Sequence, residues 1–221
     1  MDRKFTKADL KVMNEHDKQF DQQLRIVAKN AKWKTRDWSS FKAFDDLFFS
    51  TFVRTDRVAA LDGYLGATIS LRVKPLYIDE IYWEVFNLED NKKLPLSHRA
   101  VGVFVVQGPD LLNQYELTLK REPSEKNILT LAEKCFSVID KAVSEYLERG
   151  YDASNFDVEL FEDHNSCDKI LIKMLQYINL KEYDKTLVLV ETEKSDDRNG
   201  RYHGPNGGIY DYVERYCKER M

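Results

Sequence analysis

Cysteine, glycine and proline are all scarce in this chain of 221 residues, which contains three cysteines, nine glycines and five prolines. Cys135, Cys167 and Cys217 are widely spaced and odd in number, which predicts free thiols in a reducing compartment. No stretch approaches the roughly 18 consecutive apolar residues that a bilayer-spanning helix needs. The first residues also lack the apolar segment of a signal peptide. These absences predict a cytoplasmic protein with no membrane partner.

Known catalytic and ligand-binding motifs are missing as well. The chain contains no Gly-x-Ser-x-Gly nucleophile motif, no His-Glu-x-x-His zinc motif and no kinase signature. His164 and Cys167 are ligand-type side chains three residues apart, with acids nearby. A zinc site usually needs three or four protein ligands, so a solvated helix end explains this pair more simply. We therefore expect neither a metal nor a cofactor.

The overall charge balance is acidic. Charged residues make up 33% of the chain, the formal net charge is −4 and the pI is about 5.7. Hydrophobic residues make up 43%, which is enough to build a core. General nucleic-acid binding normally requires a basic surface, so we expect no nucleic-acid partner. A local basic patch stays open as an alternative.

The clearest structural pattern lies in residues 43–74, which predict a β-hairpin. Apolar and polar residues alternate from Leu65 to Lys74, as they do in a strand with one buried face. The first strand, from about Ala43 to Thr55, has phenylalanines on both faces, which predicts a central strand covered on both sides. The connecting residues 56–63 lack an Asn-Gly or Asp-Gly turn signature, so the register stays open.

A short amphipathic helix is predicted directly after the hairpin. Pro75 ends the second strand because proline has no backbone N–H for the sheet ladder. Asp79 and Glu80 lie in the expected first turn, where negative charge suits the helix dipole. Trp83 lies off the apolar stripe, and it either covers a second element or faces solvent. The stripe has helical spacing and consists of Ile78, Ile81, Tyr82 and Val85.

Most of the remaining chain is helical by pattern. Thr6 and Asp9 resemble a capping box at the start of a helix that reaches about residue 30. Residues 100–107 are a short apolar run that fits either a third strand or a helix. The leucine spacing after Pro109 predicts a helix to about residue 121. Further helices are predicted over 124–150, 170–178, 182–193 and 209–216, with a strand alternative for 182–193.

These patterns predict an α+β protein. Its first part, residues 1–123, contains the N-terminal helix, the hairpin and a small antiparallel sheet around residues 43–106. The second part, residues 124–221, is mainly α-helical and packs against the first as one compact unit. No self-similarity occurs at a fixed period, so the helices are not predicted to be repeats.

A glycine-rich stretch, residues 195–208, is a candidate site for a small anion. It precedes a predicted helix, and backbone amides at a helix N-terminus bind anions. Its spacing matches neither the P-loop nor the dinucleotide-binding fingerprint, so a flexible connector is the simpler interpretation. The positively charged candidates for anion binding are Arg198, Arg201, His203, His98 and Arg99.

A second candidate surface is the polar face of the hairpin together with nearby aromatic residues. Arginine and aromatic side chains concentrate at protein interfaces, which makes a protein interface the functional interpretation. The competing interpretation is that Arg72 or Lys74 pairs within the chain with Asp79 or Glu80. The acidic pair Glu80 and Glu84 indicates a functional site only if a basic partner lies opposite. The interface candidates are Trp33, Trp38, Trp83, Arg54, Arg72 and Lys74.

We therefore expect a non-catalytic protein that acts through contact with another protein, as an adaptor or a small bacterial immunity protein does. This expectation rests on the missing motifs and the acidic balance. The alternative is an enzyme or binding protein for an anionic small molecule that uses His98, Arg99, Arg201 and His203. A structural subunit of a larger assembly is a third hypothesis.

Overall fold

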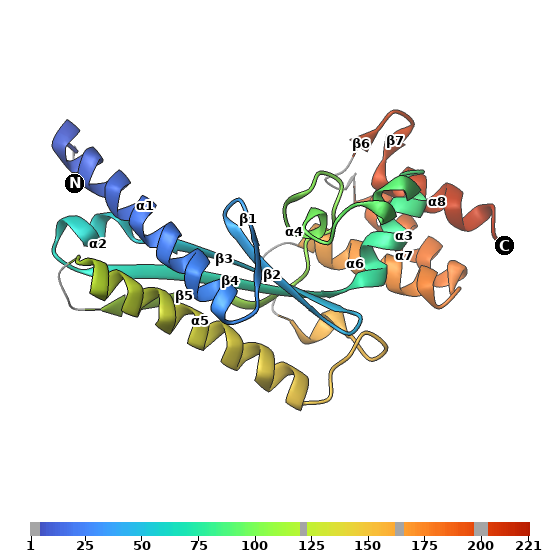
Figure 1. Cartoon of the computed structure of the whole chain (residues 1–221). Coiled ribbons are helices and arrows are strands. Elements are labelled where there is room, and N and C mark those ends of the chain that lie inside the picture. The colour runs from blue at the N-terminus through green and yellow to red at the C-terminus, as the bar shows by residue number, and fades with distance from the viewer. Residues whose placement is uncertain (1–4, 120–122, 162–165, 197–202) are drawn as a thin grey trace. The chain divides into compact units, whose positions relative to one another are not determined.

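The computed structural model describes residues 5–119, 123–161, 166–196 and 203–221, without the side chains of residues 166–168 and 203. A five-stranded antiparallel sheet of order β1-β2-β3-β4-β5 is combined with α-helices, and the C-terminal part is helical (Figure 1). The predicted α+β class is therefore confirmed. None of the described helices is long and apolar enough to cross a bilayer.

The described elements have the following bounds. The α-helices are α1 (Lys7–Asn30), α2 (Arg57–Leu61), α3 (Leu76–Val85), α4 (His98–Val101), α5 (Glu125–Glu148), α6 (Ser166–Asn179), α7 (Tyr183–Ser195) and α8 (Ile209–Lys218). The strands are β1 (Lys34–Arg36), β2 (Ser39–Phe44), β3 (Leu47–Thr55), β4 (Leu65–Pro75), β5 (Asp110–Leu119), β6 (His203–Gly204) and β7 (Gly207–Gly208). Two 3-10 helices are η1 (Glu89–Lys93) and η2 (Val158–Leu160).

The chain divides into two compact units, and each is assembled from separate stretches of sequence. Unit 1 consists of Met1–Lys42, Phe49–Arg72 and Leu111–Tyr151. Unit 2 consists of Ala43–Phe48, Val73–Asp110 and Asp152–Met221. Strands β2, β3, β4 and β5 contribute residues to both units. The expected division into residues 1–123 and 124–221, packed together as one compact unit, stays a prediction.

In unit 1, helices α1 and α5 lie on the same side of the sheet (Figure 1). The Phe49 and Tyr146 rings pack edge to face at 6.0 Å, so α5 covers the Phe49 side of β3. The Thr55 hydroxyl donates to the Asp17 carboxylate, which places α1 on that side as well. Along β4 the residues of one face are fully buried, as the alternation predicts. They are Leu65, Ala67, Ile69 and Leu71.

The ends of α1 and α5 form as their sequences indicate. Thr6 and Asp9 make the predicted capping box, with the Asp9 N–H 3.1 Å from the Thr6 hydroxyl. Ser124 caps α5, and Gly150 follows this helix with a φ of 78°, a conformation that glycine adopts at little cost. Leu10 of α1 is 45% exposed, because the first turns of α1 extend away from the sheet (Figure 1).

The predicted first strand is two strands. Asp45 adopts a φ of 46° and forms a turn with Asp46, so β2 ends at Phe44 and β3 begins at Leu47. Asp and Asn are the non-glycine residues that best tolerate this left-handed conformation. The expectation of a central strand is confirmed, since β3 is third of five. Its expected cover on both sides is incomplete, because Ser50 and Phe52 are half-buried and Arg54 is exposed. Residues 57–61 of the expected turn form helix α2, which is capped by Asp56.

The predictions for residues 100–121 are wrong in both segments. Residues 102–109 have no regular structure after the four-residue helix α4, and residues 110–119 form strand β5 instead of a helix. The leucine spacing in this segment is compatible with a helix, but pairing beside β4 in the sheet outweighs that local preference. Short apolar runs carry too little periodicity to decide between the two.

In unit 2, helices α3, α6, α7 and α8 form the core. The predicted α3 stripe is buried, and Trp83 is 1% exposed, so it covers a second element and does not face solvent. The Phe86 and Tyr212 rings stack at 4.5 Å between α3 and α8. The strand alternative for residues 182–193 is excluded because α7 is helical there. In the acidic connection after α5, Phe156 is buried whereas Leu160 is 59% exposed.

His16 is a buried polar residue of α1 in unit 1. Its side chain is 4% exposed, and neither ring nitrogen has a hydrogen-bond partner in the described part of the chain. Burial lowers the pKa of His16 from its ordinary value of 6.5, and the Asp17 carboxylate partly opposes this shift. The folded state therefore takes up this proton less readily than the unfolded chain does. Stability that depends on neutral His16 is lost as the pH falls below 6.5.

We expect His16→Leu to flatten the dependence of stability on pH. The wild type should lose up to about 1.4 kcal/mol of unfolding free energy per pH unit below the unfolded pKa, until the folded pKa is reached. The variant lacks this loss because leucine takes up no proton. Urea unfolding at about pH 7.5 and about pH 5.5 measures the difference. Parallel losses in the two proteins would contradict the role of His16.

Candidate functional site

Residues 102–109, between α4 and β5 in unit 2, form an exposed apolar loop. Val103 is 73% exposed and Phe104 is 37% exposed. Phe104 has a φ of 58°, a left-handed conformation that bulky residues rarely adopt. Such strain persists only where the surrounding structure holds it, and it concentrates at functional sites. These residues are called the apolar loop below.

Four charged side chains of unit 2 pack against one another and are called the charge cluster. Asp79, in the first turn of α3, is fully buried, and both its oxygens lie 2.8 Å from Lys74 Nζ. Arg99 of α4 places Nη1 3.4 Å from Asp79 and Nη2 2.9 Å from Glu80. Buried charges are tolerated only when they are paired and hydrogen-bonded. The charge cluster therefore combines two cations, Lys74 and Arg99, with two carboxylates, Asp79 and Glu80.

The charge cluster and Trp83 hold the backbone of the apolar loop. Asp79 Oδ1 accepts a hydrogen bond from the Val106 N–H at 3.0 Å, and Lys74 Nζ donates to the Val106 carbonyl at 2.5 Å. Trp83 Nε1 donates to the Phe104 carbonyl at 2.6 Å. The loop is thus fixed from inside the unit, while Val103 remains at the surface.

Arg99 is committed to partners within the chain. Its Nη1 donates to the Leu76 carbonyl at 2.7 Å, in addition to the contacts with Asp79 and Glu80. The guanidinium also lies 4.8 Å from the centre of the Trp83 ring, within reach of a cation–π interaction. His98 is half-buried, with its ring 6.0 Å from that of Trp83. The positive charge of Arg99 is therefore balanced internally.

The second end of the apolar loop is fixed against β4. The Val73 N–H donates to the Pro109 carbonyl at 3.2 Å. A Cβ atom at Gly108 would lie 2.4 Å from the Val73 carbonyl oxygen, closer than real Cβ contacts come. The absence of a side chain at Gly108 is thus what lets the two backbones approach.

The interface candidates from the sequence have different environments. Lys74 is 3% exposed and pairs with Asp79, so the intramolecular interpretation holds for this residue. Trp83 and Trp33 are also buried, and Trp33 Nε1 donates to Asp140 at 2.8 Å within unit 1. None of these three offers an exposed surface, because packing and hydrogen bonds cover them.

The other three interface candidates lie in unit 1 and reach its surface. Trp38 is 67% exposed in the β1–β2 turn. Arg54 is exposed and stacks over the Phe52 ring at 4.5 Å, and Arg72 is half-buried. A partner for these residues stays a prediction.

The glycine-rich anion candidate is only partly described. Arg198 and Arg201 lie outside the described residues, as does the side chain of His203. Of the candidate metal pair, His164 and the side chain of Cys167 also lie outside the described part of the chain. Anion binding by these residues stays a prediction.

Both acids of the Glu80–Glu84 pair have a basic partner. Arg99 contacts Glu80, and Lys92 donates to Glu84. Burial raises the pKa of Glu84, but hydrogen bonds from Lys92 and Tyr216 outweigh it and hold the pKa below its ordinary value. Burial and the 3.0 Å hydrogen bond to Glu84 raise the pKa of Tyr216 to about 12. Glu84 is therefore charged and paired at neutral pH.

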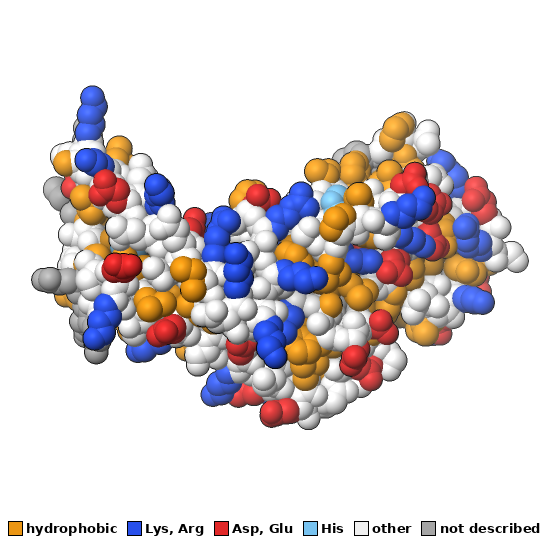
Figure 2. Space-filling model, viewed as in Figure 1, with side chains coloured by type: hydrophobic (Ala, Val, Ile, Leu, Met, Phe, Trp, Pro, Cys, Tyr) orange, Lys and Arg blue, Asp and Glu red, His pale blue; other side chains and the backbone are white. Residues whose placement is uncertain are grey.

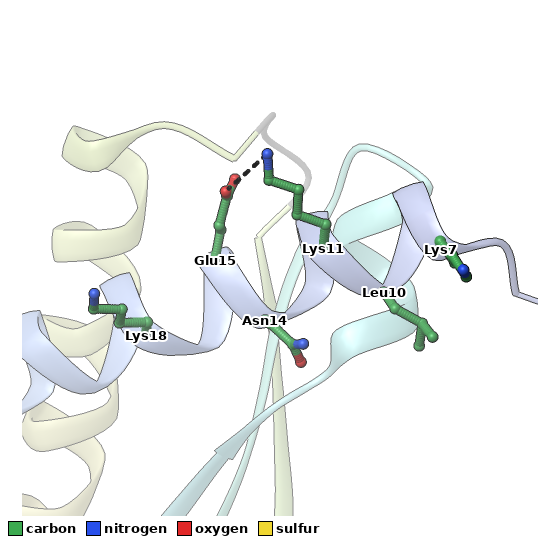
Figure 3. A pocket seen from close by; sticks show the side chains of 6 residues that line it. All are labelled: Lys7, Leu10, Lys11, Asn14, Glu15 and Lys18. Atoms are coloured by element: carbon green, nitrogen blue, oxygen red, sulfur yellow. Dashed lines mark ion pairs between the residues drawn. The ribbon is translucent and has the colours of Figure 1, made fainter.

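A shallow hollow of about 490 Å³ lies along α1 in unit 1 (Figure 3). Every described residue that lines it comes from this one helix, and Lys11 and Glu15 point toward each other across 3.9 Å. The lining consists of exposed side chains from one face of a single helix, which is unlike the concave, pre-formed sites that bind small molecules. The lining residues are Lys7, Leu10, Lys11, Asn14, Glu15 and Lys18.

The sequence predicts the pairing of Lys74 with Asp79, but it places Arg99 in an anion site and gives no sign of the apolar loop. The apolar run at residues 100–107 predicts a regular element of the fold, whereas Val103 is 73% exposed. Among the described residues, no group of three or more His, Cys, Asp or Glu side chains is arranged to hold a metal ion. Comparison of the chain with protein-family models, curated proteins and solved structures finds no match.

Proposed function

We propose that this chain is a non-catalytic protein that binds another protein through the apolar loop, as an adaptor or immunity-like protein does. The observation that carries the proposal is an exposed pair of apolar residues, Val103 and Phe104, on a backbone held by buried charges. Isolated exposed apolar residues are common, but two adjacent ones on a strained and fixed loop are less so. A rigid loop loses little conformational entropy when it binds.

The energetic cost of the charge cluster supports a role for the loop. Burying Asp79 and Lys74 requires desolvation that an apolar pair of similar size would avoid. In return, Lys74 and Asp79 fix both backbone groups of Val106. The arrangement positions the loop more precisely than apolar packing alone would, which is what a recognition surface needs.

The alternative of an anion-binding site at His98 and Arg99 has less support. Arg99 already contacts two carboxylates and the Leu76 carbonyl, so an incoming anion would compete with Asp79 and Glu80. The proposal places the protein in the cytoplasm. Its buried cysteines Cys135 and Cys217 are free thiols, which suits a reducing compartment.

Val103→Asp tests the contact surface. A carboxylate buried in an apolar interface without a partner is expected to weaken binding at least about tenfold, because its desolvation is not compensated. Tagged wild type and variant are used to capture partners from native lysate, and the recovered protein is then purified for titration by calorimetry. Val188→Asp on α7 is the matched control, since Val188 is 62% exposed in the same unit.

The outcomes separate protein contact from other roles. Loss of the partner with Val103→Asp but not with Val188→Asp supports the proposal. Equal capture by all three proteins, or no recurrent partner, contradicts it. Binding to phosphatidylcholine vesicles that depends on Val103 would instead assign the apolar loop to a membrane surface.

A further inference from the structure

The acidic net charge of the chain hides a strong difference between its two units. Unit 1 contains 20 Lys and Arg against 15 Asp and Glu, which gives a formal net charge of +5. Unit 2 contains 14 Lys and Arg against 23 Asp and Glu, which gives −9. The expectation of no nucleic-acid partner rests on the average over the whole chain, and unit 1 does not share that average.

The excess positive charge of unit 1 is concentrated in residues 25–42. This stretch contains six cations and a single acid, Asp37. Five of the cations are exposed and Lys42 is half-buried. Figure 2 shows Lys and Arg side chains gathered over the end of α1 and the β1–β2 hairpin. We call the set the basic band: Arg25, Lys29, Lys32, Lys34, Arg36 and Lys42.

Hydrogen bonds tie the end of α1 to the hairpin, so the basic band is one surface. Arg25 Nη2 donates to the Asp37 carbonyl in the β1–β2 turn at 2.7 Å. Lys42 Nζ donates to the Ala31 carbonyl at 3.3 Å, and the Trp33 N–H donates to the Ala28 carbonyl at 2.8 Å. These hydrogen bonds hold the C-terminal end of α1 against the hairpin.

An exposed aromatic ring lies within the basic band. Trp38 follows Asp37 in the turn and is 67% exposed, so most of its indole is in contact with water. Trp33, five residues earlier, shows that a tryptophan in this stretch can be buried when packing requires it. An exposed indole among cations offers two interactions at once: stacking with a planar ring and attraction to a polyanion.

We infer that the basic band and Trp38 form a binding surface for single-stranded nucleic acid. Phosphates would be neutralised by the lysines and arginines, and an unpaired base would stack on the Trp38 indole. A double strand satisfies the charges but leaves the indole without an accessible base face. An acidic protein satisfies the charges but supplies no repeated planar rings. The inference does not depend on the apolar loop, which lies in unit 2.

Fluorescence anisotropy with a labelled oligothymidine of about 20 nucleotides tests the inference, since one binding site spans fewer nucleotides than this. With four phosphate contacts, binding should weaken about 50-fold between about 50 and 200 mM salt. Trp38→Ala should weaken it about 5- to 150-fold, the range measured for loss of one base stack. The duplex of the same sequence and a polyglutamate peptide of similar length are the comparison ligands.

Charge reversal locates the surface. Lys34→Glu with Arg36→Glu should weaken binding at least about tenfold, because two phosphate contacts are replaced by repulsion. Lys7→Glu with Lys11→Glu on α1 is the matched control: both residues are exposed in unit 1, and the change in net charge is the same. The helical rise places both at least about 20 Å from Arg25 along α1. This control should lose much less affinity, because exposed charges beyond a Debye length are largely screened.

Four results would overturn the inference. They are no binding at about 50 mM salt, equal loss in the two charge-reversal variants, Trp38→Ala binding as tightly as wild type, and polyglutamate or the duplex binding as tightly as the single strand. Trp38 is exposed, so Trp38→Ala should fold, and urea unfolding verifies this before the titration.

Discussion

Asp79→Asn is expected to lower the free energy of unfolding by about 3–5 kcal/mol, the usual cost of removing one partner from a buried ion pair. Asp79 is fully buried and is the acid that Lys74 contacts with both oxygens at 2.8 Å. Without its charge, the Lys74 ammonium remains 3% exposed and uncompensated. Urea unfolding followed by circular dichroism measures the loss.

A second substitution distinguishes a stranded charge from lost packing. Lys74→Met combined with Asp79→Asn removes both buried charges and keeps the side chains similar in length. We expect this double variant to be more stable than Asp79→Asn alone, because no unpaired ammonium remains. If the double variant loses at least as much stability, the effect comes from packing.

Glu80→Gln is the matched control for Asp79→Asn. Glu80 also contacts Arg99, at 2.9 Å, but its side chain is 43% exposed. An ion pair in contact with water contributes about 0–1 kcal/mol, so this variant should be nearly as stable as the wild type. Equal losses for the two variants would mean that burial is not what makes Asp79 important.

Trp33→Ala is expected to lower the free energy of unfolding by about 3–5 kcal/mol, as other large-to-small core substitutions of this size do. The Trp33 side chain is 2% exposed, packs edge to face on Phe136 at 6.0 Å and donates to Asp140. Trp33→Phe keeps an aromatic ring but loses the donor. It should cost less than Trp33→Ala, and chemical denaturation ranks the three proteins.

Trp38→Ala is the control for this series because the same residue type occurs in the same short stretch. Its side chain is 67% exposed, so the change in stability should stay within about 0.5 kcal/mol. A loss comparable to that of Trp33→Ala would show that Trp38 packs in solution. That result would also remove the exposed ring on which nucleic-acid binding by unit 1 depends.

The elements with long, regular patterns were predictable from the sequence. The α1 capping box, the alternation along β4 and the stripe of α3 each span enough residues for the period to decide the structure. Residues 110–119 were not predictable, because their leucines fit helical spacing and only pairing beside β4 makes them a strand. The turn at Asp45 was not predictable, because the phenylalanine-rich segments on its two sides have the pattern of a single strand.

The pairing of Lys74 with Asp79 was predictable from the sequence, but the burial of this pair and the apolar loop were not. Alternation along β4 places Lys74 on the same face as Ser70 and Arg72, which are half-buried. Lys74 is instead buried, because Val106, which lies 32 residues later, comes back to accept its hydrogen bond. A single sequence contains no signal for such a contact. The net charge of the whole chain also gave no indication of the basic band, because the division into two units follows from tertiary contacts.

The packing of α1 on α5 has a consequence for how the protein is made. Trp33 and Asp140 are 107 positions apart, and a hydrogen bond joins them in the core of unit 1. During synthesis on the ribosome, the strands of unit 1 emerge in the order in which they pair, so each has its neighbour soon after it appears. Helix α1 has no such early partner in α5. The part of its apolar face that α5 covers stays available to chaperones until the ribosome has released Glu148.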